Sequence, residues 1–253
     1  MRQRTSFCLL AWAAVGLAGG AAAASVAQAP DGDAILRRVD ENIGSDNKII
    51  TSEMIIHGRR GSRSIRSKSW IQGQTRSFTE YLDPPREKGT KMLKLEGQLW
   101  TYTPASDRTI LISGHMLRQS VMGSDLSYED VTEDPRLVAL YRATVAAEEK
   151  IGDRPCWVLE LVSRGGEIAY YRRKIWVDME RDVVLREERF AKSGKLLKTT
   201  EVRSVDRVKG RWVATRVVFK DALKDGDGTE FVLEAIEFNA AIPDHVFTKA
   251  SLR

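Results

Sequence analysis

Histidine, cysteine, serine and carboxylate side chains supply most nucleophiles, bases and metal ligands. In this sequence they do not occur at the spacings of known catalytic or metal-binding motifs. The three histidines are His57, His115 and His245, and none has a second ligand residue at the spacing of a zinc site. Ser124 lies in Met-Gly-Ser-Asp, which lacks the glycine that a nucleophile elbow requires two positions after the serine. The sequence therefore predicts neither a metal centre nor a serine hydrolase.

The acidic pairs and glycine clusters also lack catalytic spacing. Adjacent carboxylates on a strand point to opposite faces, so they cannot work together as acid and base. We therefore expect surface charges at Glu129-Asp130, Glu148-Glu149 and Glu187-Glu188. The glycines of residues 165–166 and 226–228 are typical of hairpin turns, not of a phosphate-binding loop. These patterns predict a protein that is not an enzyme and that needs no cofactor or metal.

The amino terminus has the pattern of a secretory signal peptide. Arg2 and Arg4 precede an apolar run over residues 7–24, which ends in the small residues that signal peptidases favour. We predict a signal peptide over residues 1–24, with cleavage as late as residue 29, and a single domain over residues 25–253. Cys8 lies too early to become an acylated amino terminus, so we expect a periplasmic protein without a lipid anchor. The remaining Cys156 cannot form an internal disulfide and is expected to be a small buried hydrophobe.

The charge balance gives little support for a nucleic-acid partner. The formal net charge is +5, falls to +3 without Arg2 and Arg4, and comes from basic and acidic residues that alternate along the chain. Nucleic-acid-binding proteins usually gather basic residues on one face or helix. We predict no nucleic-acid partner, and we expect a monomer.

The hydrophobic pattern predicts one helix followed by many strands. Ile35, Val39 and Ile43 share a helical face over residues 31–43, with an aspartate cap before them and Gly44 after them. Turn residues then divide the chain into about ten or eleven strands, which must be antiparallel neighbours because the turns are short. This predicts a mainly β fold with one large antiparallel sheet, which should curl into a barrel or a half-barrel because twist accumulates.

Residues 113–140 interrupt the strand rhythm and are expected to form a helical or irregular lid. Several strands are apolar on both faces, so their inner faces need cover from this segment, from packed side chains or from a ligand. Within the segment, residues 122–128 have the composition of a tight, self-capped loop. One interpretation is that the loop anchors the segment, with Tyr128 packed and with Glu129 and Asp130 paired to Arg108 or Arg118. The other places the loop at the rim or hinge of a ligand cleft, with Tyr128 at its mouth.

The same region resembles the core signature of the outer-membrane lipoprotein-sorting (LolA-like) family. The similarity is strong over residues 78–130, weaker as far as residues 242–247, and is carried by Lys88-Gly89-Thr90, Leu99-Trp100-Thr101-Tyr102-Thr103-Pro104, Arg108-Thr109-Ile110, Met122-Gly123-Ser124-Asp125, Tyr128, Glu129 and Asp130. The resemblance implies a half-barrel around an apolar cavity beneath a lid. It also implies binding of acyl chains or lipidated proteins in the periplasm. The Met-Gly-Ser-Asp signature indicates a branch distinct from the lipoprotein chaperone itself.

We therefore expect a periplasmic carrier or binding protein for lipids or lipid-modified proteins, with an inner-membrane exporter or an outer-membrane acceptor as further partners. The alternative is an accessory module of an envelope (RND-type) exporter that carries nothing. The motif loop is Met122, Gly123, Ser124, Asp125, Tyr128, Glu129 and Asp130. The candidates for lining the apolar cavity are Trp70, Phe78, Leu93, Leu95, Trp100, Tyr102, Met122, Tyr128, Trp157, Leu159, Val213, Phe219 and Phe231.

Overall fold

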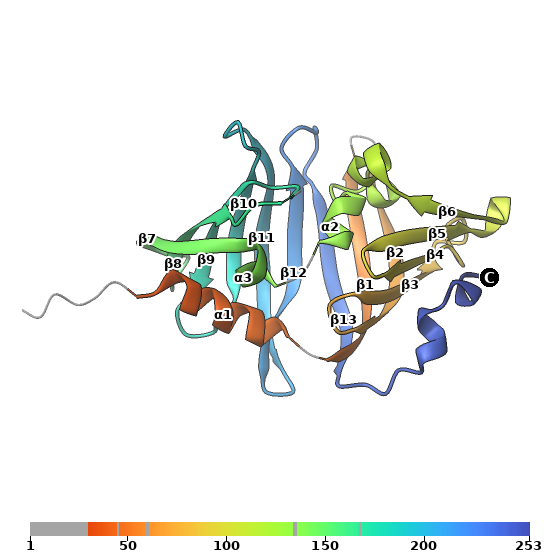
Figure 1. Ribbon diagram of the computed structural model, residues 1–253, viewed down its shortest axis with the longest axis horizontal. Helices are drawn as coiled ribbons and strands as arrows, with labels where there is room; N and C mark the ends of the chain where they lie inside the picture. The colour runs from red at the N-terminus through yellow and green to blue at the C-terminus, as the bar shows by residue number, and fades with distance from the viewer. Residues whose placement is uncertain (1–29, 45, 59–60, 134–135, 167) are drawn as a thin grey trace, which may run out of the picture.

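The computed structural model describes residues 30–44, 46–58, 61–133, 136–166 and 168–253. The predicted signal peptide lies outside the described residues. The chain forms one curved, open antiparallel sheet with short helices on one side, as expected for a mainly β half-barrel (Figure 1). None of the described helices is long and apolar enough to span a membrane.

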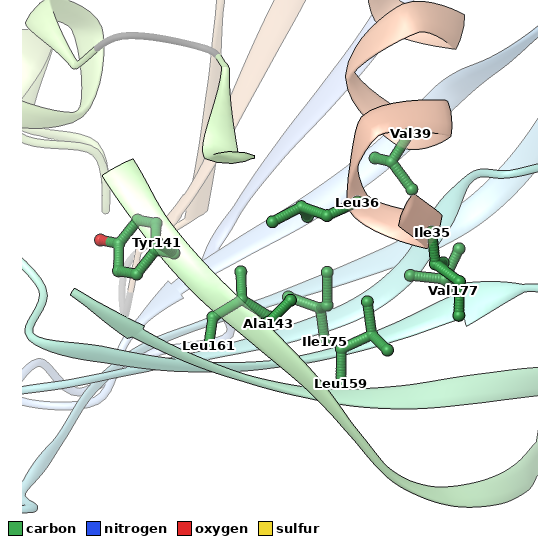
Figure 2. Close-up of a cluster of buried hydrophobic side chains, with 9 residues drawn as sticks. All are labelled: Ile35, Leu36, Val39, Tyr141, Ala143, Leu159, Leu161, Ile175 and Val177. Atoms are coloured by element: carbon green, nitrogen blue, oxygen red, sulfur yellow. The ribbon is translucent and has the colours of Figure 1, made fainter. Parts of the chain in front are cut away.

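The predicted helix is α1 (Gly32–Ile43). The side chain of Asp31 accepts a hydrogen bond from the Asp33 amide at its start, and Gly44 donates its amide to Asp40 at its end. Figure 2 shows Ile35, Leu36 and Val39 on the helix side that faces the sheet, where all three are fully buried. The apolar spacing of the helix therefore fixes which side packs on the strands.

The sheet has thirteen strands among the described residues. They are β1 (Asn47–Gly58), β2 (Gly61–Gln72), β3 (Arg76–Asp83), β4 (Lys91–Leu95), β5 (Gln98–Thr103), β6 (Arg108–Ile112), β7 (Tyr141–Ile151), β8 (Arg154–Ser163), β9 (Arg172–Asp178), β10 (Val184–Phe190), β11 (Leu196–Val208), β12 (Arg211–Asp221) and β13 (Thr229–Phe238). Residues 98–112 form two strands and not one, because residues 104–106 form a 3-10 turn and Asp107 has a left-handed backbone. This hairpin is one reason why the sequence predicted too few strands.

The strand order places the two ends of the middle segment at opposite edges of the sheet. The order is β6-β5-β4-β3-β2-β1-β13-β12-β11-β10-β9-β8-β7, so β6 and β7 are the edge strands. The chain that joins them must therefore cross the whole sheet. This middle segment (residues 113–140) contains two 3-10 turns (Gly114–Arg118 and Val121–Gly123), α2 (Tyr128–Thr132) and α3 (Leu137–Leu140). The expected helical or irregular lid is confirmed, and residues 137–140 form a helical turn before β7 begins.

We call the sheet face under α1 and the middle segment the inner face. Beneath α1 it contributes Tyr141, Ala143, Leu159, Leu161, Ile175 and Val177 to one buried cluster. Beneath the first half of the middle segment it contributes Met54, Ile56, Ile65, Tyr81, Met92, Leu99 and Ile112 to another. Much of the inner face is therefore filled by side chains.

The outer face of β3 to β5 is covered by the carboxyl-terminal segment (residues 240–253). Side chains alternate along a strand, so Phe78, Leu93 and Trp100 lie on the face opposite Met92 and Leu99. They form a buried cluster with Ala240, Ile242, Phe247 and Leu252, which lie in or near two 3-10 turns (Asp244–Phe247 and Lys249–Leu252). A fourth cluster contains Cys156, which is fully buried, as the sequence predicted.

Candidate functional site

The motif loop is tied to the sheet through the side chain of Asp125. Its Oδ1 accepts the backbone amide of Asp221 at 2.9 Å, and its Oδ2 accepts the hydroxyl of Thr229 at 2.8 Å. The Asp125 amide in turn donates to the Thr229 hydroxyl at 3.0 Å, and Thr229 is fully buried. Because a carboxylate has two acceptor oxygens, Asp125 joins the loop both to the end of β12 and to the start of β13.

The backbone of the loop makes a left-handed turn at Met122 and Gly123. Their φ angles are 50° and 71°, and a Cβ on residue 123 would lie 3.0 Å from the guanidinium of Arg63, which donates a hydrogen bond to the Met122 carbonyl. Glycine avoids both the strain and the collision. Glycine at position 123 therefore has a structural role, because it allows the loop to turn next to Arg63.

Asp130 holds α2 to the sheet. It closes a capping box in which Ser127 donates both its amide, at 2.7 Å, and its hydroxyl, at 2.8 Å. Tyr170 donates its hydroxyl to Asp130 at 2.6 Å, Arg189 donates at 2.9 Å, and Lys198 forms an ion pair with it. Burial alone would raise the pKa of Asp130, but the charges of Arg189 and Lys198 lower it to about 2.

The ion pairs continue from α2 into the centre of the inner face. Arg173, with a side chain 2 % exposed, donates to Glu187 at 2.7 Å and pairs with Glu133 just after α2. Arg189 also donates to Glu187 at 2.9 Å. Burial raises the pKa of Glu187, yet Arg189 and Arg173 lower it to about 2. Three cations and three carboxylates thus form one buried set, the charged network: Arg173, Arg189, Lys198, Asp130, Glu133 and Glu187.

This network corrects the expectation that both members of each acidic pair lie at the surface. The Asp130 side chain is only 4 % exposed and Glu187 is buried, whereas Glu129 lies 4.0 Å from Arg118 and Glu188 pairs with Arg186. Glu187 and Glu188 lie on opposite faces of β10, as predicted, and the burial of Asp130 and Glu187 is made tolerable by Arg173 on β9 and Arg189 on β10. The partners of Asp130 are Arg189 and Lys198, not Arg108 or Arg118.

Two cavities lie on either side of α2. The larger cavity has a volume of about 1090 Å³ and contacts Ser127, Glu129 and Thr132, and the smaller has a volume of about 380 Å³ and contacts Asp130 and Val131. Glu133 borders both cavities. The short helix and the charged network therefore divide the space beneath the middle segment.

The larger cavity has a mixed lining, which differs from the wholly apolar hollow that we expected. Its charged residues are Arg118, Asp125, Glu129, Glu133, Lys198, Asp221 and Lys224. Its apolar residues include Leu117, Leu126, Leu140, Ile168, Leu197 and Leu223. The middle segment is attached here by polar contacts, and those contacts also form the cavity wall. Such a site suits a ligand with both polar and apolar parts.

The comparisons with known proteins agree with this architecture. A family model described as "Uncharacterized protein" matches residues 73–253. The chain belongs to that family. No curated protein matches the sequence.

Three crystal structures show the same LolA-like fold. A DUF1329 family protein from Desulfovibrio piger ATCC 29098 aligns with a TM-score of 0.81 and 23% identity, covering 89% of this chain and 100% of that one. A putative outer membrane lipoprotein-sorting protein domain from Vibrio parahaemolyticus gives 0.76 and 24%, with coverages of 87% and 97%. A LolA superfamily protein from Nitrosomonas europaea gives 0.74 and 24%, with coverages of 88% and 100%. The predicted family resemblance and half-barrel fold are confirmed.

Within this LolA-like fold, six of the cavity candidates lie on the outer face. Trp70, Phe78, Leu93, Leu95, Trp100 and Tyr102 belong to or pack against the cluster under the carboxyl-terminal segment. They are shifted by one strand position from the inner-face residues, which reverses the face. They therefore do not line the space beneath the lid.

The other candidates lie on the side of the lid but complete its packed cores. Trp157 and Leu159 belong to the α1 cluster, and Met122, Tyr128 and Phe231 to the cluster under the first half of the middle segment. Phe219 meets Phe231 edge to face, with ring centroids 5.4 Å apart, and Val213 shares its strand face. None of the thirteen candidates lines either cavity, whereas Asp125 and Glu129 line the larger and Asp130 the smaller.

Sequence reasoning missed the residues that form the centre of the site. Glu187 was expected to be a surface charge, and the other residues that were not predicted as part of the site are Arg173, Arg189, Lys198 and Tyr170. One signal was present: three consecutive cations, Arg172, Arg173 and Lys174, cannot all point outward on a strand. The inward one needs a buried carboxylate partner.

The described residues contain no group of three or more histidines, cysteines or carboxylates that could hold a metal ion. The clustered groups of the site are instead paired cations and carboxylates with depressed carboxylate pKa values. Such an arrangement holds segments together and can contact polar ligand groups.

Proposed function

We propose that this protein is a periplasmic carrier or binding protein for lipids or lipid-modified proteins, and that acyl chains occupy the space beneath the middle segment. The observation that carries the proposal is that this segment crosses the inner face yet leaves two cavities, of about 1090 and 380 Å³. Pockets of a few hundred to about 1000 Å³ are typical of small-molecule sites. The fold is shared with a putative outer membrane lipoprotein-sorting domain, which supports the same assignment.

The energetics favour an amphipathic ligand. An acyl chain gains about 0.8 kcal/mol for each CH₂ group removed from water. The apolar lining of the larger cavity, including Leu117, Leu126 and Leu197, provides this environment. Its polar groups, such as Lys224 and Glu129, can contact a head group. A ligand with a chain and a polar end therefore fits better than a pure hydrocarbon.

The attachment of α2 suits a segment that moves to admit cargo. The helix has five residues and none of them is fully buried. Tyr128 and Val131 pack partly buried against the apolar cluster beneath it, while Asp130, and Glu133 just beyond the helix, tie it to the sheet through ion pairs. Ion pairs can be exchanged for contacts with water or with a polar ligand, whereas a packed apolar helix would expose its core. We propose that α2 moves aside for ligands that span both cavities.

Export to the periplasm is part of the proposal and rests on the sequence pattern of residues 1–24. Expression of the full chain in a Gram-negative host, followed by fractionation and amino-terminal sequencing, tests it. We expect periplasmic protein that begins between residues 25 and 30. Unprocessed protein in the cytoplasm would refute this part alone.

Native mass spectrometry tests carriage directly. Protein purified from the envelope should show mass additions that disappear after organic extraction, and extracted protein should take up added phospholipid or fatty acid. A matched pair of variants locates the site: Leu197→Arg puts a charge into the larger cavity, while Leu196→Arg changes the adjacent position on the opposite strand face. We expect occupancy to fall in the first variant and to persist in the second. Protein that never carries lipid, before or after incubation, would overturn the proposal.

One observation favours the alternative, an exporter module that carries nothing. The two edges of the sheet differ: β7 is covered where Asp33 accepts the Ala143 amide and Arg164 donates to the Tyr141 carbonyl. Edge strand β6 instead exposes Ile110 and Leu111, at 44 % and 43 %. Exposed edge strands can pair with a strand from another protein.

A photo-crosslinking residue at position 110 distinguishes this alternative from lipid carriage. Crosslinks to an exporter subunit, in protein that binds no lipid, would favour the accessory role. Lipid binding without such crosslinks would favour the carrier.

A further inference from the structure

Two of the three cations that line the larger cavity are already held by the protein. Lys198 donates to the Asp125 carbonyl at 2.9 Å and also contacts the Ser127 hydroxyl and the charged network. Lys224 donates to the Ser124 carbonyl at 2.7 Å. An ammonium group has three donors, so Lys198 keeps none for a ligand.

Three of the four carboxylates in the same lining are also engaged. Asp125 is bonded to β12 and β13, and Glu133 pairs with Arg173. Asp221 accepts the backbone amide two residues further on at 3.0 Å. These groups hold the middle segment and the β12–β13 turn in place, so a ligand that took them over would first have to break contacts of the protein.

Arg118 and Glu129 are the exception among the charged lining residues. Arg118 ends the 3-10 turn Gly114–Arg118, and Glu129 lies in the first turn of α2. The Arg118 Nε and a carboxylate oxygen of Glu129 are 4.0 Å apart, which is too long for a hydrogen bond. Within the part of the chain that the structure describes, neither side chain forms a closer polar contact. Their side chains are 82 % and 31 % exposed, so the pair is weak and open to a ligand.

The spacing of this pair suits a head group that carries both charges. A group with only a negative charge would be attracted by Arg118 and repelled by Glu129 from almost the same place. A phosphate and an ammonium joined by two carbons place the nitrogen and the nearest ester oxygen roughly 3 to 4 Å apart, given ordinary bond lengths. Such a group can lie alongside the pair with each charge beside its opposite. A primary ammonium suits Glu129 better than a quaternary one, because only the primary ammonium donates hydrogen bonds to a carboxylate.

Apolar surface lies next to this pair within the same cavity. Leu117 directly precedes Arg118, and further apolar side chains come from the motif loop, from α3, from the β8–β9 connection and from β11. None of these side chains is fully buried: Leu117, Leu126, Leu140, Ile168 and Leu197. An acyl chain that covered them would remove apolar surface of both the protein and the lipid from water.

We infer that the larger cavity is selective for lipids whose head group has a phosphate and a primary ammonium, such as phosphatidylethanolamine. The phosphate contacts Arg118, the ammonium contacts Glu129, and the acyl chain lies against the apolar lining beyond them. This inference rests on the proposed function, since it assumes that acyl chains enter the space beneath the middle segment. It adds that the head group, not the chain alone, decides which lipid is held.

Isothermal titration with three lysophospholipids tests this inference. The lipids share one tetradecanoyl chain, carry ethanolamine, choline or glycerol on the phosphate, and are added below their micelle concentrations to delipidated protein from the envelope. We expect the ethanolamine lipid to bind about tenfold more tightly than the other two, as expected for hydrogen bonds between charged groups.

Variants of the pair assign each contact. Glu129→Gln should weaken the ethanolamine lipid about tenfold and should not weaken the glycerol lipid, because only the first has an ammonium. Arg118→Gln should weaken all three lipids, because they share the phosphate. The matched controls are Glu201→Gln and Arg203→Gln, which change an exposed ion pair on β11 that borders neither cavity and should alter no affinity.

The outcomes separate this inference from the proposed function. Equal affinities for the ethanolamine and glycerol lipids, unchanged by Glu129→Gln, would overturn the inference and leave lipid carriage standing. A choline lipid that binds as tightly as the ethanolamine lipid would also overturn it, since it has no N–H to donate. Binding of all three lipids that survives Leu197→Arg would place them outside the larger cavity, with the same consequence. Failure of the unmodified protein to bind these lipids or any intact phospholipid would instead contradict the proposed function.

Discussion

The two faces of the sheet are covered in contrasting ways. On the outer face, the carboxyl-terminal segment buries Phe247 and Leu252 against Leu93 and Trp100 in an apolar cluster. On the inner face, the second half of the middle segment is held by a buried charged network, and cavities remain on both sides of α2. A segment held by apolar contacts cannot leave the sheet without exposing apolar side chains to water. A segment held by ion pairs can exchange those pairs for contacts with water or with other polar groups.

The largest expected effect comes from removing the arginine at the centre of the inner face. Arg173→Met leaves Glu133 and Glu187 with one fewer cation in a buried position, so we expect the free energy of unfolding to fall by about 3 to 5 kcal/mol. Arg172→Met, at the preceding residue of β9, changes a 37 % exposed side chain paired with Glu160 and should cost less than about 1 kcal/mol. Urea denaturation measures both. Similar losses in the two variants would contradict the contrast between the faces.

The outer face should respond as a packed core that has no part in binding. Leu93 is fully buried, so Leu93→Ala should lower the free energy of unfolding by about 3 kcal/mol through lost burial and the cavity that remains. Lipid occupancy measured on the folded protein should not change. Leu95→Ala, at the half-buried margin of the same cluster, should cost less. A loss of lipid binding in Leu93→Ala would mean that the outer face takes part in carriage.

Acid should weaken the charged network on the inner face. Asp130 and Glu187 both have a folded pKa of about 2, below their ordinary values of 3.8 and 4.5. Each therefore stabilises the fold above about pH 4.5, and this contribution, roughly 2 to 3 kcal/mol per group, disappears as the pH falls towards 2. Unfolding free energies measured from pH 6 to pH 2 should fall steeply in the unmodified protein and less steeply in Asp130→Asn with Glu187→Gln. Equal slopes would refute the assignment of acid sensitivity to these groups.

The smallest effect concerns the start of α2. Ser127→Ala removes a hydroxyl that donates to Asp130 within the capping box, and we expect a loss of about 1 kcal/mol. Hydrogen exchange of residues 128–133 should become faster than in the unmodified protein. Ser113→Ala is the control, because Ser113 makes no side-chain cap to the 3-10 turn that follows it. Unchanged exchange in Ser127→Ala would show that the cap does not limit the opening of α2.

Local patterns predicted the elements of the fold well. The spacing of Ile35 and Val39 and the cap at Asp31 define α1, and short turns define the antiparallel meander. The β5–β6 hairpin escaped prediction because Asp107 supplies a left-handed backbone that glycine usually supplies. The sequence left open whether the motif loop anchors the middle segment or borders a ligand cleft. Asp125 does anchor it, and its partner Thr229 lies more than a hundred residues away in the chain.

The composition of the site could not be predicted from the sequence, for two physical reasons. A shift of one position along a strand reverses the face, so Leu93 and Met92 could not be assigned without the pairing register. A charged strand residue has the sequence signature of a solvated surface. Arg173 and Glu187 can be buried because they pair with each other across β9 and β10, and because Glu133 and Arg189 add further charges of opposite sign. The apolar residues that the sequence pattern selected form the filled cores. The cavities lie at the borders of these cores, where charged residues contribute to the lining.

Photo-labelling tests the central claim most directly. A fatty acid with a diazirine in its chain, bound to the delipidated protein and activated by light, should label residues that border the two cavities on either side of α2, in α1, the middle segment and the strands beneath them. Labelling of the outer cluster around Trp100 and Phe247, or scattered labelling that excess unlabelled lipid does not compete away, would contradict the view that this sheet carries its ligand under the middle segment.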